Sequence, residues 1–178
     1  DGGGMSNING SPTLDGCTFT GNTANRGGGM YNDSRAVLTN CIFENNTAYS
    51  GGGMYNTQSS NPTLENCTFA NNTADHGGGM YITNNSNPTF VGCVFENNTA
   101  DFDGGGIYSI GNDFLILSDL IVSDNYAGNN GGGLYISSGT WAAKSSIHFS
   151  ELKMNFAGNS GGGLYSALDV GVLLEGCL

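Results

Sequence analysis

Short stretches of alternating apolar and polar residues make up most of this sequence, and the triplet Gly-Gly-Gly interrupts them at regular intervals. Each triplet is followed by a long apolar residue and, in six of the seven repeats, by tyrosine next. The triplets recur every 24 to 30 residues and begin at Gly2, Gly27, Gly51, Gly77, Gly104, Gly131 and Gly161. A repeat of this length without a 3.6-residue period excludes a solenoid of helix pairs and predicts short β-strands.

Alignment of the repeats on their triplets places similar side chains at equivalent positions. One column is mostly leucine: Leu14, Leu38, Leu64, Phe90, Leu117, Ile147 and Leu174. A second column, three residues later, is mostly cysteine: Cys17, Cys41, Cys67, Cys93, Leu120, Ser150 and Cys177. A third is mostly phenylalanine: Phe19, Phe43, Phe69, Phe95, Val122 and Leu152. Such columns are expected where equivalent strands of successive repeats lie side by side.

A one-residue bend is predicted between the leucine and cysteine columns. Their spacing of three residues breaks the alternation of a strand, and the residue before the cysteine position is mostly Gly, Asn or Asp. These residues tolerate a left-handed backbone better than others do. Phe149 occupies this place in the sixth repeat, so we expect that coil to bend differently.

These features predict one all-β domain spanning residues 1–178, a right-handed single-stranded parallel β-helix (solenoid) of about seven coils. The hand follows from the strong bias of parallel crossovers. Successive coils of such a fold lie about 4.8 Å apart, so each column becomes a ladder of like residues. The glycine triplets are expected at a corner that requires a positive φ or a close approach of two backbones.

Asparagine and alanine each occupy one column in all six complete repeats. The asparagines are Asn22, Asn46, Asn72, Asn98, Asn125 and Asn155. The alanines are Ala24, Ala48, Ala74, Ala100, Ala127 and Ala157. An inward asparagine ladder allows each side-chain amide to bond its own turn and the amide of the next coil, which satisfies polar groups that the turn would bury. We therefore predict a structural asparagine ladder.

Charge limits the partners of this chain. Only 11% of residues are charged, and four Lys and Arg against fifteen Asp and Glu give a formal net charge of −11. This charge repels nucleic acids and anionic lipids and favours cationic groups or metal ions. No run of about 20 apolar residues occurs, so no membrane span is predicted.

The five cysteines suggest a disulfide framework or a metal site at first sight. However, all five belong to one inward column, and stacking in register points their Cβ atoms in the same direction. Buried free thiols are therefore preferred, with Cys17–Cys41 and Cys67–Cys93 as the plausible bridges. A zinc site is not predicted because CxxC pairs are absent and His76 and His148 are far apart in the sequence.

Candidate chemistry gathers at the corner before the triplets. Equivalent positions there hold Arg26, Asp75, His76, Asp101 and Asp103. Stacking would bring Asp75 and His76 close to Asp101 and Asp103, where they could hold Ca²⁺ or act as a carboxylate pair. Against a calcium loop, Gly105 and Asn112 stand where ligands are required. A solvated corner is preferred, so we assign no catalytic residue, metal or cofactor. The other acids Glu44, Glu65, Glu96, Asp119 and Asp124 are expected singly on the surface.

The tyrosines after the triplets form a further column. They are Tyr31, Tyr55, Tyr81, Tyr108, Tyr135 and Tyr165. An outward aromatic stripe could contact glycan rings or protein, whereas half-buried rings would pack under a neighbouring loop. The packing alternative is slightly preferred.

The phrase Phe-x-x-Asn, followed by Thr-Ala and a glycine corner with an aliphatic residue, resembles the repeats of chlamydial polymorphic membrane proteins and related bacterial autotransporter passengers. In this sequence it reads Phe19-Thr-Gly-Asn22, Phe43-Glu-Asn-Asn46, Phe69-Ala-Asn-Asn72 and Phe95-Glu-Asn-Asn98. The chain has glycine where that family has alanine in the Gly-Gly-Ala corner, and Val122 and Leu152 replace phenylalanine in later repeats. The resemblance implies a right-handed β-helix that is displayed or secreted and acts in adhesion.

Three functions remain as hypotheses. The first is a non-enzymatic structural or adhesive segment of a longer bacterial surface protein, located outside the cell and contacting a host or glycan surface. The second is a filament subunit whose partner is another copy, stacked head to tail through unpaired coil edges. The third is a polysaccharide lyase or glycoside hydrolase that uses the corner of Asp75, His76, Asp101 and Asp103; it rests on fold analogy alone.

Overall fold

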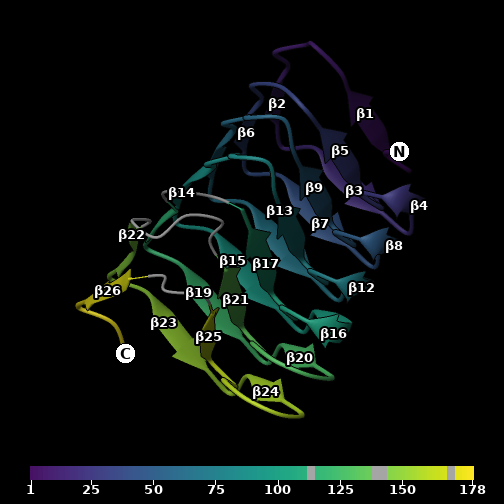
Figure 1. The fold of residues 1–178 in the computed structure, drawn as a ribbon. Helices are drawn as coiled ribbons and strands as arrows, with labels where there is room; N and C mark the ends of the chain where they lie inside the picture. The colour runs from purple at the N-terminus through teal and green to yellow at the C-terminus, as the bar shows by residue number, and fades with distance from the viewer. Residues whose placement is uncertain (112–114, 138–143, 168–170) are drawn as a thin grey trace.

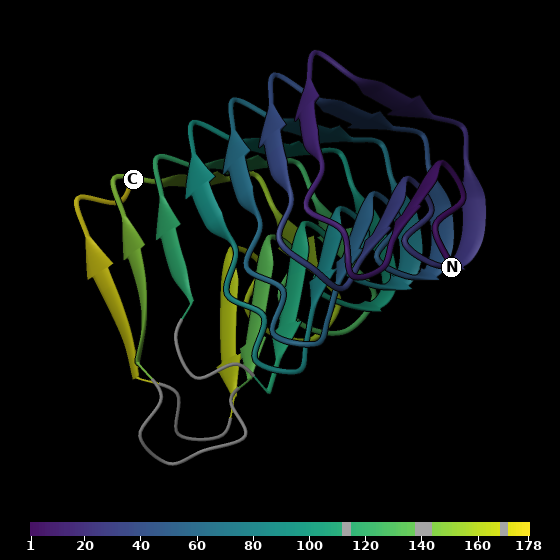
Figure 2. The same ribbon diagram turned by 90° about the horizontal axis from the view of Figure 1, so that it is seen from above.

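The computed structural model describes residues 1–111, 115–137, 144–167 and 171–178. Within these ranges every regular element is a β-strand, and every strand pair is parallel. The chain winds into a solenoid whose coils follow one another from the N-terminus to the C-terminus (Figures 1 and 2). One sheet has seven strands and two have six, so six coils are complete and a seventh is partial. The predicted all-β parallel solenoid is confirmed.

Equivalent strands of successive coils form five sheets, here called A to E. Sheet A follows the triplets and contains β1 (Met5–Asn7), β5 (Met30–Asn32), β9 (Met54–Asn56), β13 (Met80–Ile82), β17 (Ile107–Ile110), β21 (Leu134–Ser137) and β25 (Leu164–Ala167). Sheet B contains β2 (Thr13–Asp15), β6 (Val37–Thr39), β10 (Thr63–Glu65) and β14 (Thr89–Val91). The corresponding strands of later coils form sheet E, with β18 (Ile116–Ser118), β22 (Lys144–His148) and β26 (Gly171–Glu175).

The other two sheets complete each coil and lead back to the next triplet. Sheet C contains β3 (Thr18–Thr20), β7 (Ile42–Glu44), β11 (Thr68–Ala70), β15 (Val94–Glu96), β19 (Ile121–Ser123) and β23 (Glu151–Lys153). Sheet D contains β4 (Thr23–Arg26), β8 (Thr47–Ser50), β12 (Thr73–His76), β16 (Thr99–Asp103), β20 (Tyr126–Ala127) and β24 (Phe156–Ala157).

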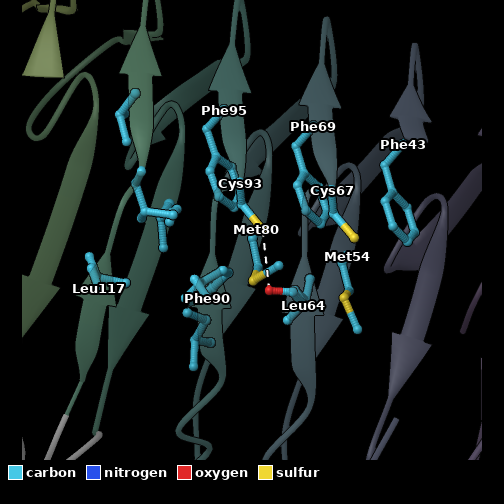
Figure 3. Packing of buried hydrophobic residues seen from close by; sticks show 14 of the residues in the cluster. Phe43, Met54, Leu64, Cys67, Phe69, Met80, Phe90, Cys93, Phe95 and Leu117 are labelled. Atoms are coloured by element: carbon cyan, nitrogen blue, oxygen red, sulfur yellow. Dashed lines mark hydrogen bonds between the residues drawn. The ribbon is translucent and has the colours of Figure 1, made fainter. Parts of the chain in front are cut away.

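The strand register confirms the columns read from the sequence. Phe43, Phe69 and Phe95 pair directly across sheet C and are fully buried. Their rings stack with centroids 4.7 and 4.6 Å apart, beside the buried cysteines and methionines (Figure 3). Because each coil supplies the same apolar set, one continuous core runs along the solenoid.

The bend before the cysteine column is also confirmed. All seven residues at this position have φ between 46° and 63°: Gly16, Asn40, Asn66, Gly92, Asp119, Phe149 and Gly176. The prediction that Phe149 would bend differently was wrong. Its side chain is 67% exposed, and its backbone N–H donates to the carbonyl of Glu175 at 2.9 Å, so the coil imposes the common geometry on an unfavourable residue.

A second left-handed bend separates sheet C from sheet D and was not predicted. It lies one residue before the asparagine ladder, at Gly21, Asn45, Asn71, Asn97, Asp124 and Met154. The glycine corner supplies a third change of direction. There the first glycine has a positive φ, and a Cβ on the middle glycine of the third triplet, Gly52, would lie 2.5 Å from the carbonyl oxygen of Gly78 in the next coil. Both predicted reasons for the triplet therefore apply.

Candidate binding surface

The asparagine ladder joins coils rather than closing individual turns. Oδ1 of Asn72 accepts hydrogen bonds from the backbone N–H and the Nδ2 of Asn46, both at 3.0 Å. Nδ2 of Asn72 donates to the carbonyl of Phe43 at 2.9 Å and to Oδ1 of Asn98 at 3.0 Å. The predicted bond to the next amide is confirmed, but the predicted bond to the residue's own turn is wrong, because every bond crosses to a neighbouring coil.

A second, shorter asparagine ladder lies at the end of sheet A and was missed. Asn7 Nδ2 donates to Asn32 Oδ1 at 2.7 Å, and Asn32 Nδ2 donates to Asn56 Oδ1 at 3.0 Å. The ladder ends where Ile82 pairs with Asn56. The buried Nδ2 of Asn56 has no hydrogen-bond partner among the described residues. The recurring phrase Met-Tyr-Asn at residues 30–32 and 54–56 was the available signal.

The five cysteines are free thiols, as predicted. Cys41, Cys67 and Cys93 are fully buried. Each sulfur donates to the leucine-column carbonyl of the preceding coil, as Cys93 Sγ does to Leu64 at 3.5 Å (Figure 3). Contact with the Cys93 thiol, together with burial, raises the pKa of Cys67. Burial likewise raises the pKa of Cys41. These groups are core, not reactive nucleophiles.

The acidic corner is only partly brought together. Nδ1 of His76 lies 3.7 Å from Oδ2 of Asp103, and Oδ1 of Asp103 accepts from the backbone N–H and the Nδ2 of Asn130 at 3.1 and 3.0 Å. A shift of register between β12 and β16 pairs His76 with Asp103. Asp101 is left on the exposed surface, away from that pair.

No group of three or more His, Cys, Asp or Glu residues able to hold a metal occurs within the described ranges. Asn112, the twelfth position of the predicted calcium loop, lies outside the described residues. The corner therefore provides one histidine–carboxylate contact and not a ligand set. Asp75, also a member, is half-buried on β12. Arg26, the fifth member, forms a bidentate ion pair with Asp1 at 2.7 and 2.8 Å.

The tyrosine column packs against the corner instead of standing free. Tyr31 and Tyr55 are buried, and the later members are half-buried. The Arg26 guanidinium lies 5.1 and 5.5 Å from the ring centroids of Tyr31 and Tyr55, and His76 lies 5.0 Å from that of Tyr108. Burial raises the pKa of Tyr81 to about 12. This geometry matches the packing alternative for the stripe.

Exposed aromatic side chains lie elsewhere, on the outer side of sheet D, and were missed. Tyr49 is 56% exposed and Tyr126 44% exposed. Tyr126 continues a row that begins with threonine: Thr23, Thr47, Thr73, Thr99, Tyr126 and Phe156. Tyr126 and Phe156 stack with centroids 5.7 Å apart and planes 9° apart. The position directly before the inward alanine column was the signal, since alternation turns it outward.

The strands of sheet D follow one another along one side of the solenoid (Figure 1), so this row runs parallel to its axis.

Two surface hollows lie away from the acidic corner. A hollow of about 470 Å³ is lined by Ser145, Ser146, Gly171, Val172 and Leu173, and another of about 310 Å³ by Asn61, Asn87, Pro88, Thr89 and Ile116. Neither includes Asp75, Asp101 or Asp103. In the described part of the chain there is no helix with the length and apolarity of a membrane span.

Comparison with known proteins places this geometry in a family. Residues 2–152 match the family model described as "Right handed beta helix region". No curated protein and no solved structure matches the chain. The match covers more than four fifths of the 178 residues, including six of the seven glycine triplets.

Proposed function

Because this chain belongs to the right-handed β-helix family, we propose that it is a non-enzymatic structural and adhesive segment of a bacterial surface protein, displayed outside the cell. The observation that carries the proposal is the asparagine ladder, which links every coil from Asn22 to Asn155. Such a ladder keeps the coils in one register, so outward side chains recur at about 4.8 Å along a stiff rod. A rod of this kind suits display and repeated contact.

The resemblance to polymorphic membrane proteins and autotransporter passengers supports the same proposal, because it implies adhesion at a surface. Net charge narrows the partner further. A formal charge of −11 favours host or glycan surfaces that carry cationic or neutral groups over anionic ones.

An enzymatic role is less well supported by the side chains. A pair of catalytic carboxylates requires two acids directed at one reacting bond. Here Asp103 is bonded by Asn130, whereas Asp101 faces solvent. A polysaccharide lyase or hydrolase that uses this corner therefore remains the alternative proposal.

One experiment separates the two. The purified chain is immobilised and tested for retention of host cells and of beads coated with single polysaccharides under flow, while the effluent is assayed for reducing ends and unsaturated sugars. We expect reversible retention of at least one surface without product release. The same chain after heat denaturation is the negative control. Product release that disappears in Asp101→Ala or Asp103→Ala would overturn the proposal in favour of an enzyme.

Self-association is a second candidate, favoured by the parallel, in-register ladders. Every coil pairs with the next in the same register, so a second copy of this chain stacked head to tail would continue the ladders. Electron microscopy and sedimentation of the chain at rising concentration test this: axial fibres are expected, and monodisperse particles at high concentration would exclude it.

A further inference from the structure

Seven Asn-x-Ser/Thr triplets occur in the chain and have no place in the function proposed above. Their asparagines are Asn9, Asn32, Asn45, Asn66, Asn71, Asn84 and Asn97. This triplet is the acceptor motif for N-linked glycans, which require an accessible asparagine amide and an accessible hydroxyl two residues later. The fold separates triplets that meet this condition from triplets that do not.

Three of the triplets stack at the bend between sheets C and D. Asn45, Asn71 and Asn97 are exposed, with φ of 55°, 55° and 54°. They lie at equivalent places in coils two, three and four, which follow one another along the solenoid (Figure 1), so neighbouring acceptors are about 4.8 Å apart. Their side chains form no hydrogen bond with any described residue. Asn9 and Asn66 are exposed too, but they have no equivalent triplet in a neighbouring coil.

The backbone of each stacked triplet is held by neighbouring coils, while its first and third side chains stay outside. In coil three, the N–H of Asn71 donates to the carbonyl of Glu96 at 3.1 Å. The N–H of Thr73 donates to the carbonyl of Asn46 at 2.9 Å. The middle residue, Asn72, belongs to the buried asparagine ladder. The amide of Asn71 and the hydroxyl of Thr73 therefore belong to two exposed residues on either side of a buried one.

The fold itself requires neither the acceptor asparagine nor the threonine. Gly21, Asp124 and Met154 form the same bend in other coils, with φ of 66°, 57° and 52°. Tyr126 and Phe156 take the place of the threonine in coils five and six. In coils two to four both residues nevertheless occur together and in register. Backbone geometry alone does not account for this pairing.

Two other triplets are used by the fold and are closed to modification. Asn32 is fully buried, and its Nδ2 donates to Asn56 in the second asparagine ladder. Nδ2 of Asn84 donates to the hydroxyl of Thr57 at 2.9 Å. The third residue of that triplet, Ser86, is fully buried. These triplets provide internal controls, because they have the same motif without the accessibility.

From this arrangement we propose that Asn45, Asn71 and Asn97 are acceptor sites for N-glycosylation of the folded chain. The donor is a sugar activated as a diphosphate ester, carried by a nucleotide or a lipid, and a glycosyltransferase supplies the base. Asparagine Nδ2 bonds to the anomeric carbon, while the bond from that carbon to the diphosphate oxygen breaks and the diphosphate leaves with the electron pair. The proton lost from Nδ2 passes to the base. These sites go beyond the adhesive function proposed above and do not depend on it.

Site-resolved mass spectrometry of the whole folded chain tests the proposal. One arm uses UDP-glucose with a soluble asparagine glucosyltransferase, and the other uses a lipid-linked oligosaccharide with a membrane oligosaccharyltransferase. We expect glycan on all three acceptors in at least one arm, which also identifies the kind of donor. Asn32 and Asn84 should stay unmodified in the folded chain. Synthetic peptides that contain each triplet are the positive control and should all be modified.

Matched variants separate the motif from the fold. Thr73→Val removes the hydroxyl but keeps a β-branched side chain, and it should abolish modification of Asn71 while the other two acceptors are unchanged. Asp124→Asn alone should add no site, because Tyr126 stands two residues later. Asp124→Asn together with Tyr126→Thr should add a fourth site in coil five. Both changes introduce residues that coils two to four already have at these places. Circular dichroism checks that each variant is folded.

Contrary results are equally specific. If the peptides are modified but the folded chain carries no glycan on the three acceptors in either arm, the proposal is wrong. Equal modification of Asn32 and Asn84 in the whole chain would mean that unfolded molecules are the acceptors, which also contradicts it. Finally, the chain purified from the cells that naturally make it should carry glycan on the same three asparagines, and their absence of modification there would overturn the assignment.

Discussion

Coils one to four stack phenylalanine rings in sheet C inside the solenoid, whereas coils five and six have aliphatic residues there and stack two aromatic rings on the outer side of sheet D. In residues 2–103, Phe19, Phe43, Phe69 and Phe95 form the inner column, with centroids 4.6 to 4.8 Å apart. In residues 104–160, Val122 and Leu152 take those inner positions, and Tyr126 and Phe156 stack on the outer side of sheet D. The strand order is the same in both regions.

The difference shows which features the fold requires. A column of inner rings is dispensable, since aliphatic side chains fill the same place with full burial at Val122. The asparagine ladder and the glycine corner, by contrast, persist through both regions. The ladder hydrogen-bonds backbone groups, and the glycine corner makes room for the close approach of backbones. Every coil has the same backbone groups at these places, so every coil needs both features. Side chains that only fill volume are free to vary and to move to the surface.

Removing one ladder asparagine should have the largest effect, and the same effect in both regions. Asn72→Leu leaves the buried N–H of Asn46 and the carbonyl of Phe43 without these partners. At about 1–3 kcal/mol for each unsatisfied group, we expect a loss of about 3–5 kcal/mol in the free energy of unfolding. Urea denaturation of Asn72→Leu and Asn125→Leu measures it.

Asn25→Ala is the control, because Asn25 is exposed and makes no side-chain hydrogen bond within the described residues. The free energy of unfolding of this variant should stay within about 0.5 kcal/mol of the wild-type value. If a ladder variant lost no more free energy of unfolding than this control, the asparagine ladder would not be a feature that both regions require.

Replacing an inner ring should have the next largest effect, and it converts one region into the other. Phe69→Val places in coil three the residue that coil five already has. It removes two ring stacks, at 4.7 and 4.6 Å, and opens a cavity, so we expect a loss of about 2–3 kcal/mol. Leu152→Val, at a partly buried member of the same column, should lose about 1 kcal/mol. Thermal and urea unfolding compare the two; equal losses would contradict a specific contribution of the inner rings.

Exchanging the bend residues between the regions should give a smaller, reciprocal effect. Met154 has φ 52° and is 79% exposed, and Asn97 occupies the same bend with φ 54°. Because methionine is strained in the left-handed region and asparagine tolerates it, Met154→Asn should stabilise the chain by about 1 kcal/mol and Asn97→Met should destabilise it by about as much. Denaturant midpoints of the two variants measure this. Changes of the same sign would show that side-chain contacts, not backbone strain, decide the bend.

Alkaline titration tests the tyrosine column common to both regions. Burial raises the pKa of Tyr81 from 10.0 to about 12. The unfolded chain therefore loses this proton at lower pH than the folded chain, so the stabilisation is complete below pH 10 and is lost between pH 10 and about 12. Unfolding of wild type and Tyr81→Phe across this range measures it. A wild-type loss no steeper than that of the variant would contradict a buried Tyr81.

Much of the architecture followed from residue spacing. The columns, the bend before the cysteines, the free thiols and the asparagine ladder were predictable because a coil repeats the same environment at the same place. The bends at Phe149 and Met154 could not be predicted from residue type, since neither residue favours the left-handed backbone that it adopts. There the hydrogen bonds of neighbouring coils outweigh local preference.

The candidate surface was predictable only in part. Asp75 and His76 were expected close to Asp101 and Asp103, and the structure brings His76 and Asp103 into contact. One inserted residue explains the rest: β16 has Asp101, Phe102 and Asp103 where β12 has Asp75 and His76. The resulting shift of register pairs Asp103 with His76 and leaves Asp101 exposed. This pairing cannot be predicted from the spacing of residues within one repeat.

Residue order alone was sufficient for the parallel solenoid, its number of coils and its core columns, because these depend on periodicity and on which residues tolerate a bend. Tertiary structure alone decided the direction of the amide bonds, the covering of the tyrosine column by Arg26 and His76, and the exposure of Tyr49 and Tyr126 on sheet D. Those features depend on contacts between side chains of different coils, and such contacts change with a single inserted residue while the periodicity does not.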